Sequence, residues 1–197
     1  MMRGLLLLLL AAFLTALPAE PVLADWKLVE GGRTTTIGKT SMRVTPTGDW
    51  NRTDAADFAE HWTRDGILLN DVLIVAGMPE GWTLYEASDE EERPLPELSA
   101  QLDIIEIPEF FEKSTRLALN TPVFTITSVE PATMSGHAAV KFTFDYALPD
   151  SPLNRRGVAM GTMVEGKLYL IAFDGPATYF FDRDRAEVEA IMASATF

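Results

Sequence analysis

The sequence predicts an α+β fold: a mostly antiparallel sheet of about seven or eight strands packed with helices, arranged like an α/β/α sandwich in a single domain. First, residues 138–173 contain three strand-like runs in succession, and the first of them alternates apolar and polar side chains. Second, residues 182–195 repeat apolar side chains at helical spacing. Third, further strand-like runs precede residue 77 and are separated from the later ones by one helical stretch. Helices segregated in this way from hairpin-connected strands are typical of layered α+β domains.

β-branched and apolar runs joined by turn residues form the expected strands of the N-terminal half. Gly38-Lys39 separates two such runs and favours a type II′ hairpin, because glycine comes first in the pair. Residues 54–63 fit either a short helix capped by Asp54 or a strand. We prefer a hairpin across Asp65-Gly66, which is a strong turn signal. The other strands expected here are 33–37, 40–44, 67–69 and 72–76.

Residues 97–119 form the helical centre of the chain. Their apolar side chains recur at helical spacing, but Pro108 cannot lie inside a helix without removing a hydrogen bond. We therefore expect two helices that meet near Ile107, with Pro108 in the first turn of the second. The preceding residues 77–96 are polar and rich in proline and acidic side chains, which indicates a surface loop.

The C-terminal segment predicts the most regular part of the fold. Its strands follow one another directly, and Glu165-Gly166 is the turn between the last two. In the final helix Val188, Ile191 and Met192 share the face that we expect to be buried. The expected elements, in order, are a strand at 123–129, a turn at 131–137, strands at 138–146, 156–164 and 167–173, and a helix at 182–195.

Residues 1–24 have the pattern of a secretory signal peptide. Arg3 provides the positive start, residues 4–17 are almost entirely apolar, and small residues ending at Ala24 offer a cleavage site. The alternative is an uncleaved membrane anchor, but the apolar run of about 14 residues is shorter than the roughly 20 that cross a bilayer. We expect residues 25–197 to be the mature single domain, located in the periplasm or outside the cell.

The chain carries 16 basic and 29 acidic residues, which gives a formal net charge of −13. This charge repels phosphate backbones and anionic lipid surfaces, so we expect no nucleic-acid partner. The sequence contains no cysteine, and we therefore expect no disulfide, no thiolate metal site, no cysteine nucleophile and no lipoprotein anchor. After the first segment no stretch is long and apolar enough to predict a transmembrane span.

Motifs of known catalytic sites are absent from the sequence, which has no G-x-S-x-G, S-x-x-K, H-E-x-x-H, Walker or G-x-G-x-x-G pattern. His61 lies near Asp57 and Asp65 and could act as a general base oriented by a carboxylate. A partly exposed histidine in a carboxylate-rich chain is the simpler interpretation. The acidic run at 89–92 lacks the spacing of an EF-hand loop. We therefore expect no catalytic residue, no metal site and no cofactor.

Aromatic side chains give the strongest indication of a binding surface. All four tryptophans lie in the N-terminal half, and the string from Trp62 to Gly66 combines an aromatic ring, both charges and a turn. Large aromatic side chains with a polar edge often line interfaces and ligand clefts. We expect a binding surface formed by Trp62, Arg64, Asp65 and Trp82, with both tryptophans partly exposed in one concave region.

Several strings resemble those of a family of exported proteobacterial proteins without an assigned function. They are Asp49-Trp50-Asn51, Trp62-Thr63-Arg64-Asp65-Gly66, Leu168-Tyr169-Leu170-Ile171 and Tyr179-Phe180. The layout of elements is also similar to the PsbP-like or Mog-type α/β/α sandwich. That resemblance implies binding and assembly roles rather than catalysis, although a fold does not by itself assign a function.

Three functional hypotheses follow from the sequence. The first is a non-catalytic exported binding or accessory domain, whose partner is an envelope protein or a small molecule. The second is a periplasmic hydrolase that uses His61 with Asp57 or Asp65, and it requires these side chains to meet in a pocket. The third is a structural envelope component, which predicts an exposed apolar patch and no well-formed pocket.

Overall fold

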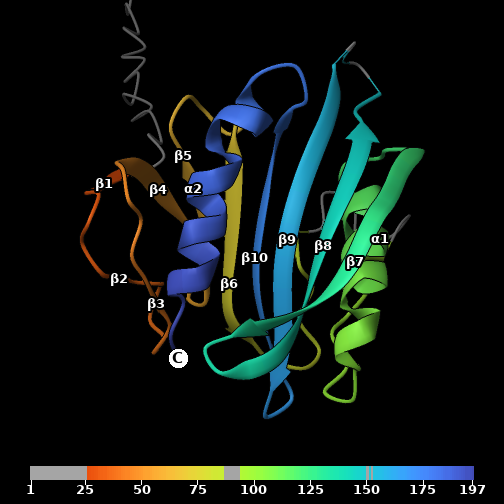
Figure 1. Ribbon diagram of the computed structural model, residues 1–197. Coiled ribbons are helices and arrows are strands. Elements are labelled where there is room, and N and C mark those ends of the chain that lie inside the picture. Colours follow the sequence, from red (N-terminus) through yellow and green to blue (C-terminus); the bar gives the residue numbers. More distant parts are fainter. Residues whose placement is uncertain (1–25, 87–93, 150, 152) are drawn as a thin grey trace, which may run out of the picture.

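A computed structural model describes residues 26–86, 94–149, 151 and 153–197. It shows one eight-stranded antiparallel sheet with a helix packed on each face (Figure 1). This arrangement confirms the predicted α+β fold class. In the described part of the chain, no helix is both long and apolar enough to cross a membrane. The expected signal peptide and the acidic run at 89–92 lie outside the described residues.

The main sheet consists of two four-stranded halves that meet at its centre. In the order β1-β4-β5-β6-β10-β9-β8-β7, the N-terminal strands come first and the C-terminal strands follow. β6 and β10 join the halves, with Ile74 opposite Ile171 and Asp71 opposite Asp174. The strands are β1 (Lys27–Val29), β4 (Trp50–Ala56), β5 (Ala59–Thr63), β6 (Asp71–Met78), β7 (Val123–Met134), β8 (His137–Ala147), β9 (Asn154–Val164) and β10 (Lys167–Pro176).

Period-2 alternation along the central strands sends side chains into two separate cores. The helix α2 (Phe180–Ser194) covers one face, and its Val188 and Ile191 are fully buried there. The helix α1 (Ile107–Ala118) covers the other face, where its Phe111 packs against Phe142 and Phe144. Each such buried side chain stabilises the fold by about 1.5–3 kcal/mol. The predicted burial of one face of the last helix is therefore confirmed.

The predicted C-terminal meander is also confirmed, with longer strands than expected. Glu165 and Gly166 form the β9–β10 turn with φ angles of 52° and 73°, as a type I′ hairpin requires. Within β9, a Cβ atom on Gly157 would lie only 2.1 Å from the ring of Phe144. Glycine therefore allows the tip of this aromatic ring to contact the β9 backbone directly.

The expectations for the N-terminal strands are only partly correct. Residues 54–63 form no helix: β4 and β5 make a hairpin whose turn is Asp57-Phe58. β5 and β6 pair across the predicted Asp65-Gly66 region, but residues 67–69 are not a strand. Instead the Leu69 and Asn70 amides donate to the Gly66 carbonyl. The predicted hairpin around Gly38 forms as a separate two-stranded sheet of β2 (Thr35–Thr36) and β3 (Arg43–Val44).

The first of the two predicted central helices is absent. The Leu98 amide donates to the Trp82 carbonyl over 2.8 Å, and the Gly81 amide donates to the Leu98 carbonyl over 2.9 Å. This pairing holds residues near 98 in an extended conformation, and only the 3₁₀ turn η1 (Ile104–Glu106) precedes α1. The second helix begins at Ile107 with Pro108 in its first turn, as predicted.

The predicted turn at 131–137 is shorter in the structure. β7 continues through Pro131 to Met134, and Ser135-Gly136 alone turns the chain into β8. Proline has no amide hydrogen for a ladder, but β7 is an edge strand of the sheet. An edge strand tolerates proline because one side of its backbone has no neighbour to bond.

Candidate functional site

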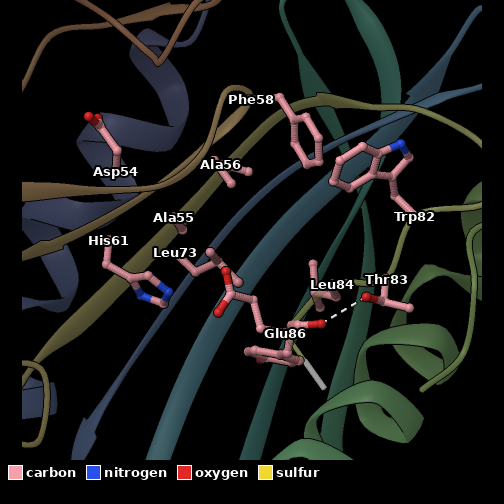
Figure 2. Close-up of a pocket in the computed structure, with 12 residues that line it drawn as sticks. Asp54, Ala55, Ala56, Phe58, His61, Leu73, Trp82, Thr83, Leu84 and Glu86 are labelled. Atoms are coloured by element: carbon pink, nitrogen blue, oxygen red, sulfur yellow. Dashed lines mark hydrogen bonds between the residues drawn. The ribbon is translucent and has the colours of Figure 1, made fainter. Parts of the chain in front are cut away.

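A pocket of about 430 Å³ opens on the α1 side of the sheet, at the end nearest the β4–β5 turn (Figure 2). Its floor is apolar and includes Ala59, Leu73 and Leu84, which belong to the α1-side core. One wall comes from the β4–β5 hairpin, and the other comes from residues 82–86. Pockets of this size and lining are typical of sites for small molecules.

Phe58 and Trp82 form an aromatic corner at the rim of the pocket. Their ring centroids lie 5.1 Å apart and their planes meet at 90°, and Figure 2 shows the two rings side by side. The Phe58 carbonyl accepts from the Ala76 amide, and the Trp82 carbonyl accepts from the Leu98 amide. These hydrogen bonds hold the backbone at both residues, and the Trp82 side chain remains 54% exposed.

His61 of β5 is a titratable side chain that lines the pocket. Its Nδ1 lies 2.9 Å from Oδ1 of Asp71. An Nδ1–H that donates to Asp71 leaves Nε2 as an acceptor when the ring is neutral. Burial lowers the pKa of His61, but the hydrogen bond to Asp71 and the negative charges of Asp71 and Asp174 outweigh it. The pKa of His61 is therefore raised above its ordinary value of 6.5.

A row of charged and polar side chains continues from His61 across the same face of the sheet. Asp174 of β10 lies directly opposite Asp71. It accepts a hydrogen bond from Nε of Arg155 over 2.6 Å and one from the Tyr146 hydroxyl over 2.8 Å. Burial raises the pKa of Asp174, and the positive charge of Arg155 opposes this increase. Asp174 thus compensates the charge of Arg155 within the protein. Asp71 places a carboxylate on the side of His61 that faces away from the pocket.

The remaining polar groups of the pocket differ in whether they already have partners. The Thr83 hydroxyl donates to the Tyr85 carbonyl over 2.8 Å, and the Tyr85 hydroxyl bonds Thr115. Figure 2 shows the Glu86 carboxylate directed into the pocket and the Asp54 carboxylate turned away from it. Asp54 instead pairs with Lys27 at 3.2 Å. Among the described lining residues there is no lysine or arginine.

Trp82 is the one residue of the predicted binding surface that lines this pocket. The expectation that Trp62 is partly exposed beside it is wrong, because Trp62 is 0% exposed. Trp62 follows His61 directly in β5, so its side chain points to the opposite face of the sheet. There its indole N–H donates to the buried carboxylate of Glu60 over 2.7 Å.

Arg64 and Asp65 lie in an ion-pair network that fastens the β5–β6 turn to α2. The guanidinium of Arg64 lies 3.3 Å from Asp184 and 4.4 Å above the ring of Trp50. Asp65 pairs with Arg183, which also pairs with Asp184. Burial raises the pKa of Asp184, but its hydrogen bonds and neighbouring guanidinium groups lower it more, so the pKa lies below its ordinary value. These charges are satisfied within the protein.

The carboxylates expected to orient His61 have other partners. Asp57 pairs with Lys39 at 2.8 Å, and Asp65 pairs with Arg183. The actual partner, Asp71, lies ten positions from His61 and reaches it because β5 and β6 pair with His61 opposite Leu73. The part of the chain that the structure describes holds no group of three or more His, Cys, Asp or Glu suited to a metal ion.

The fold and the pocket together define a single-domain α/β/α sandwich with a small aromatic cavity at one end. No protein-family model matches the chain, and no curated protein sequence matches it. Among solved structures, the chain is similar to the solution structure of cyanobacterial PsbP (CyanoP) from Synechocystis sp. PCC 6803. The identity is 15%, the TM-score is 0.43, and the match covers 86% of this chain and 80% of that one. The expected PsbP-like resemblance is therefore found, and it is weak.

Proposed function

We propose that the protein is an exported, non-catalytic binding domain that holds a small organic molecule in the pocket between Phe58, Trp82 and His61. The single observation that carries this proposal is the aromatic corner, in which a tryptophan stays 54% exposed at the rim of an apolar cavity. Burying apolar surface is favourable by about 25 cal/mol per Å². A ligand that covers Trp82 therefore gains affinity without any rearrangement of the sheet.

The hydroxyl groups of the pocket favour binding over covalent catalysis. Thr83 and Tyr85 use their hydroxyls in hydrogen bonds within the protein. The described lining includes no serine and no cysteine beside His61. Nucleophilic catalysis requires an activated nucleophile within hydrogen-bond reach of a base. A non-covalent binding role needs only the cavity and its few open polar atoms.

Export is supported by the amino-acid pattern of residues 1–24, with its positive start, apolar run and small residues before Asp25. It predicts that the mature protein begins at Asp25. N-terminal sequencing of protein from a periplasmic or culture fraction tests this expectation. Recovery of a chain that still carries residues 1–24 would contradict it.

Binding is tested by titrating the purified mature protein with a library of small molecules and following tryptophan fluorescence and heat. The variant Trp82→Ala should weaken any hit by at least about tenfold, because the exposed ring supplies most of the contact surface. Trp26→Ala is the matched control, since Trp26 is 41% exposed and does not line the pocket. Equal loss of affinity in both variants would contradict the assignment of the site.

A second candidate function is hydrolysis of a bound molecule by water, with His61 as the general base. The observation that favours it is the hydrogen bond from His61 to Asp71, which is how a catalytic imidazole is oriented. A general base contributes roughly 10²- to 10⁴-fold to a rate. His61→Gln should therefore abolish turnover of a hydrolysed ligand and change its affinity only modestly. Ligand recovered intact after prolonged incubation with the wild-type protein supports the binding role.

A further inference from the structure

We propose that the molecule held in this pocket is an organic cation, with an aromatic or aliphatic body and an ammonium group that carries N–H donors. This inference rests on the proposed binding function and names the chemical class of its ligand. It is drawn from the aromatic corner, from the two open acceptors of the pocket and from the absence of lysine and arginine among its described lining residues.

The aromatic corner provides a surface that attracts positive charge. The faces of tryptophan and phenylalanine rings carry partial negative charge, and Trp is the strongest cation–π partner of the common aromatic side chains. Phe58 and Trp82 stand at 90° with centroids 5.1 Å apart. Two rings at a right angle present a concave edge on which an alkylammonium group can contact one ring while the ligand body contacts the other.

The open polar atoms of the pocket are acceptors. The carboxylate of Glu86 is directed into the cavity (Figure 2), and within the described chain it makes no hydrogen bond or ion pair. His61 uses Nδ1 toward Asp71, and its Nε2 likewise has no hydrogen-bond partner among the described residues. A carboxylate and a neutral imidazole nitrogen both accept hydrogen bonds. They match a ligand that donates, which an ammonium group does with up to three N–H bonds.

The surroundings exclude an anionic ligand on electrostatic grounds. Arg155, the arginine of the polar row, is bound to Asp174 and only 6% exposed. When His61 is neutral, an anion in the cavity would therefore face Glu86 and the Asp71 charge behind His61 without a compensating lysine or arginine among the described lining residues. The net charge of −13 further raises the local concentration of cations and lowers that of anions.

Three probes of nearly equal size separate charge from shape: 2-phenylethylamine as the cation, 2-phenylethanol as the neutral molecule and phenylacetate as the anion. Each is titrated into the mature protein by calorimetry at about pH 8, where less of His61 is protonated. We expect the cation to bind at least about tenfold more tightly than the alcohol, and phenylacetate to bind more weakly than both.

Glu86→Gln should lower the affinity of the cation by about five- to tenfold and leave that of the alcohol unchanged. Glu97→Gln is the control, because it removes the same charge from an exposed side chain on the neighbouring segment, outside the pocket lining. An equal loss of cation affinity in both variants would indicate a general effect of the protein's negative charge. It would overturn the assigned contact between the cation and Glu86. Equal or tighter binding of the alcohol or of phenylacetate would overturn the cation inference while the binding function stands. Failure of all three probes to bind would overturn both.

Discussion

Two charged clusters lie on opposite faces of the β5–β6 hairpin, and they differ in whether their charges are satisfied. On the α2 side, Arg64 and Asp65 are paired with acidic and basic side chains of α2. On the α1 side, His61 and Glu86 each have acceptor atoms with no hydrogen-bond partner among the residues that the structure describes. The first cluster holds the structure together and the second is available to a ligand. Open polar atoms in a cavity, rather than a high density of charge in the sequence, therefore mark a binding site.

The two tryptophans of this hairpin region give the largest expected contrast. Trp62→Ala should lower the free energy of unfolding by about 3–5 kcal/mol, because it opens a cavity in the core and removes a donor from buried Glu60. Trp82→Ala should lower it by less than about 1 kcal/mol, because most of that ring is already exposed. Urea unfolding of both variants measures the difference. Similar losses of stability would show that Trp82 belongs to the core.

Asp184 tests the satisfied cluster. Its carboxylate is 1% exposed and pairs with Arg64 and Arg183. Asp184→Ala should destabilise the fold by about 1.5–3 kcal/mol, since it removes a buried carboxylate that bonds the buried Asn70 amide and two partly exposed guanidinium groups. Asp182→Ala, at an exposed position two residues earlier, should cost less than about 1 kcal/mol. If the urea midpoint of unfolding of the Asp184 variant equals that of the wild type, the network does not hold α2 in place.

The pH dependence of stability tests His61, which belongs to the cluster with open acceptor atoms. The folded-state pKa of His61 is raised above 6.5, so its charged form stabilises the fold. This stabilisation is fully present below about pH 6.5 and is lost as the pH rises through the higher folded-state pKa. Unfolding measured from about pH 5.5 to pH 9 should show the loss in the wild type and not in His61→Gln. NMR titration of the His61 ring in Asp71→Asn should show a lower pKa than in the wild type.

Protonation of His61 should weaken the binding of a cation, although it stabilises the fold. Protonated His61 repels a cation and no longer offers an acceptor at Nε2. The affinity for 2-phenylethylamine should therefore increase as the pH rises through the pKa of His61. Calorimetry at several pH values on the wild type and His61→Gln measures this effect. An affinity that falls with pH in the wild type would contradict the role given to His61.

The sequence is most informative where local periodicity and tertiary burial agree. Val188, Ile191 and Met192 are spaced for one helical face, and the sheet buries that same face. The turn at Asp57-Phe58 was missed because it lacks a strong turn signal, and Phe58 is placed there by its contact with Trp82. The helix expected after residue 97 does not form because Leu98 pairs with a distant backbone segment, which periodicity cannot indicate.

The site was only partly predictable for the same reason. Trp82 was predictable because large aromatic side chains with a polar edge often line ligand clefts, but Asp71 reaches His61 only through the register of a hairpin. His61 and Trp62 are neighbours in a strand, so alternation alone places their side chains on opposite faces of the sheet. Glu86 lies in a loop without regular structure, and its position depends on the pairing of residues 81–83 with residues 97 and 98.

The most direct test of the account is a ¹H–¹⁵N NMR titration of the mature protein with 2-phenylethylamine. We predict that the indole N–H of Trp82 and the backbone amides of Glu86 and His61 shift together and saturate with one dissociation constant. The chemical shifts of the Arg64 and Asp65 amides, in the satisfied cluster, should not change. Shifts centred on Arg64 and Asp65, or a spectrum that does not change, would contradict the central claim that the open cluster on the α1 side is the binding site.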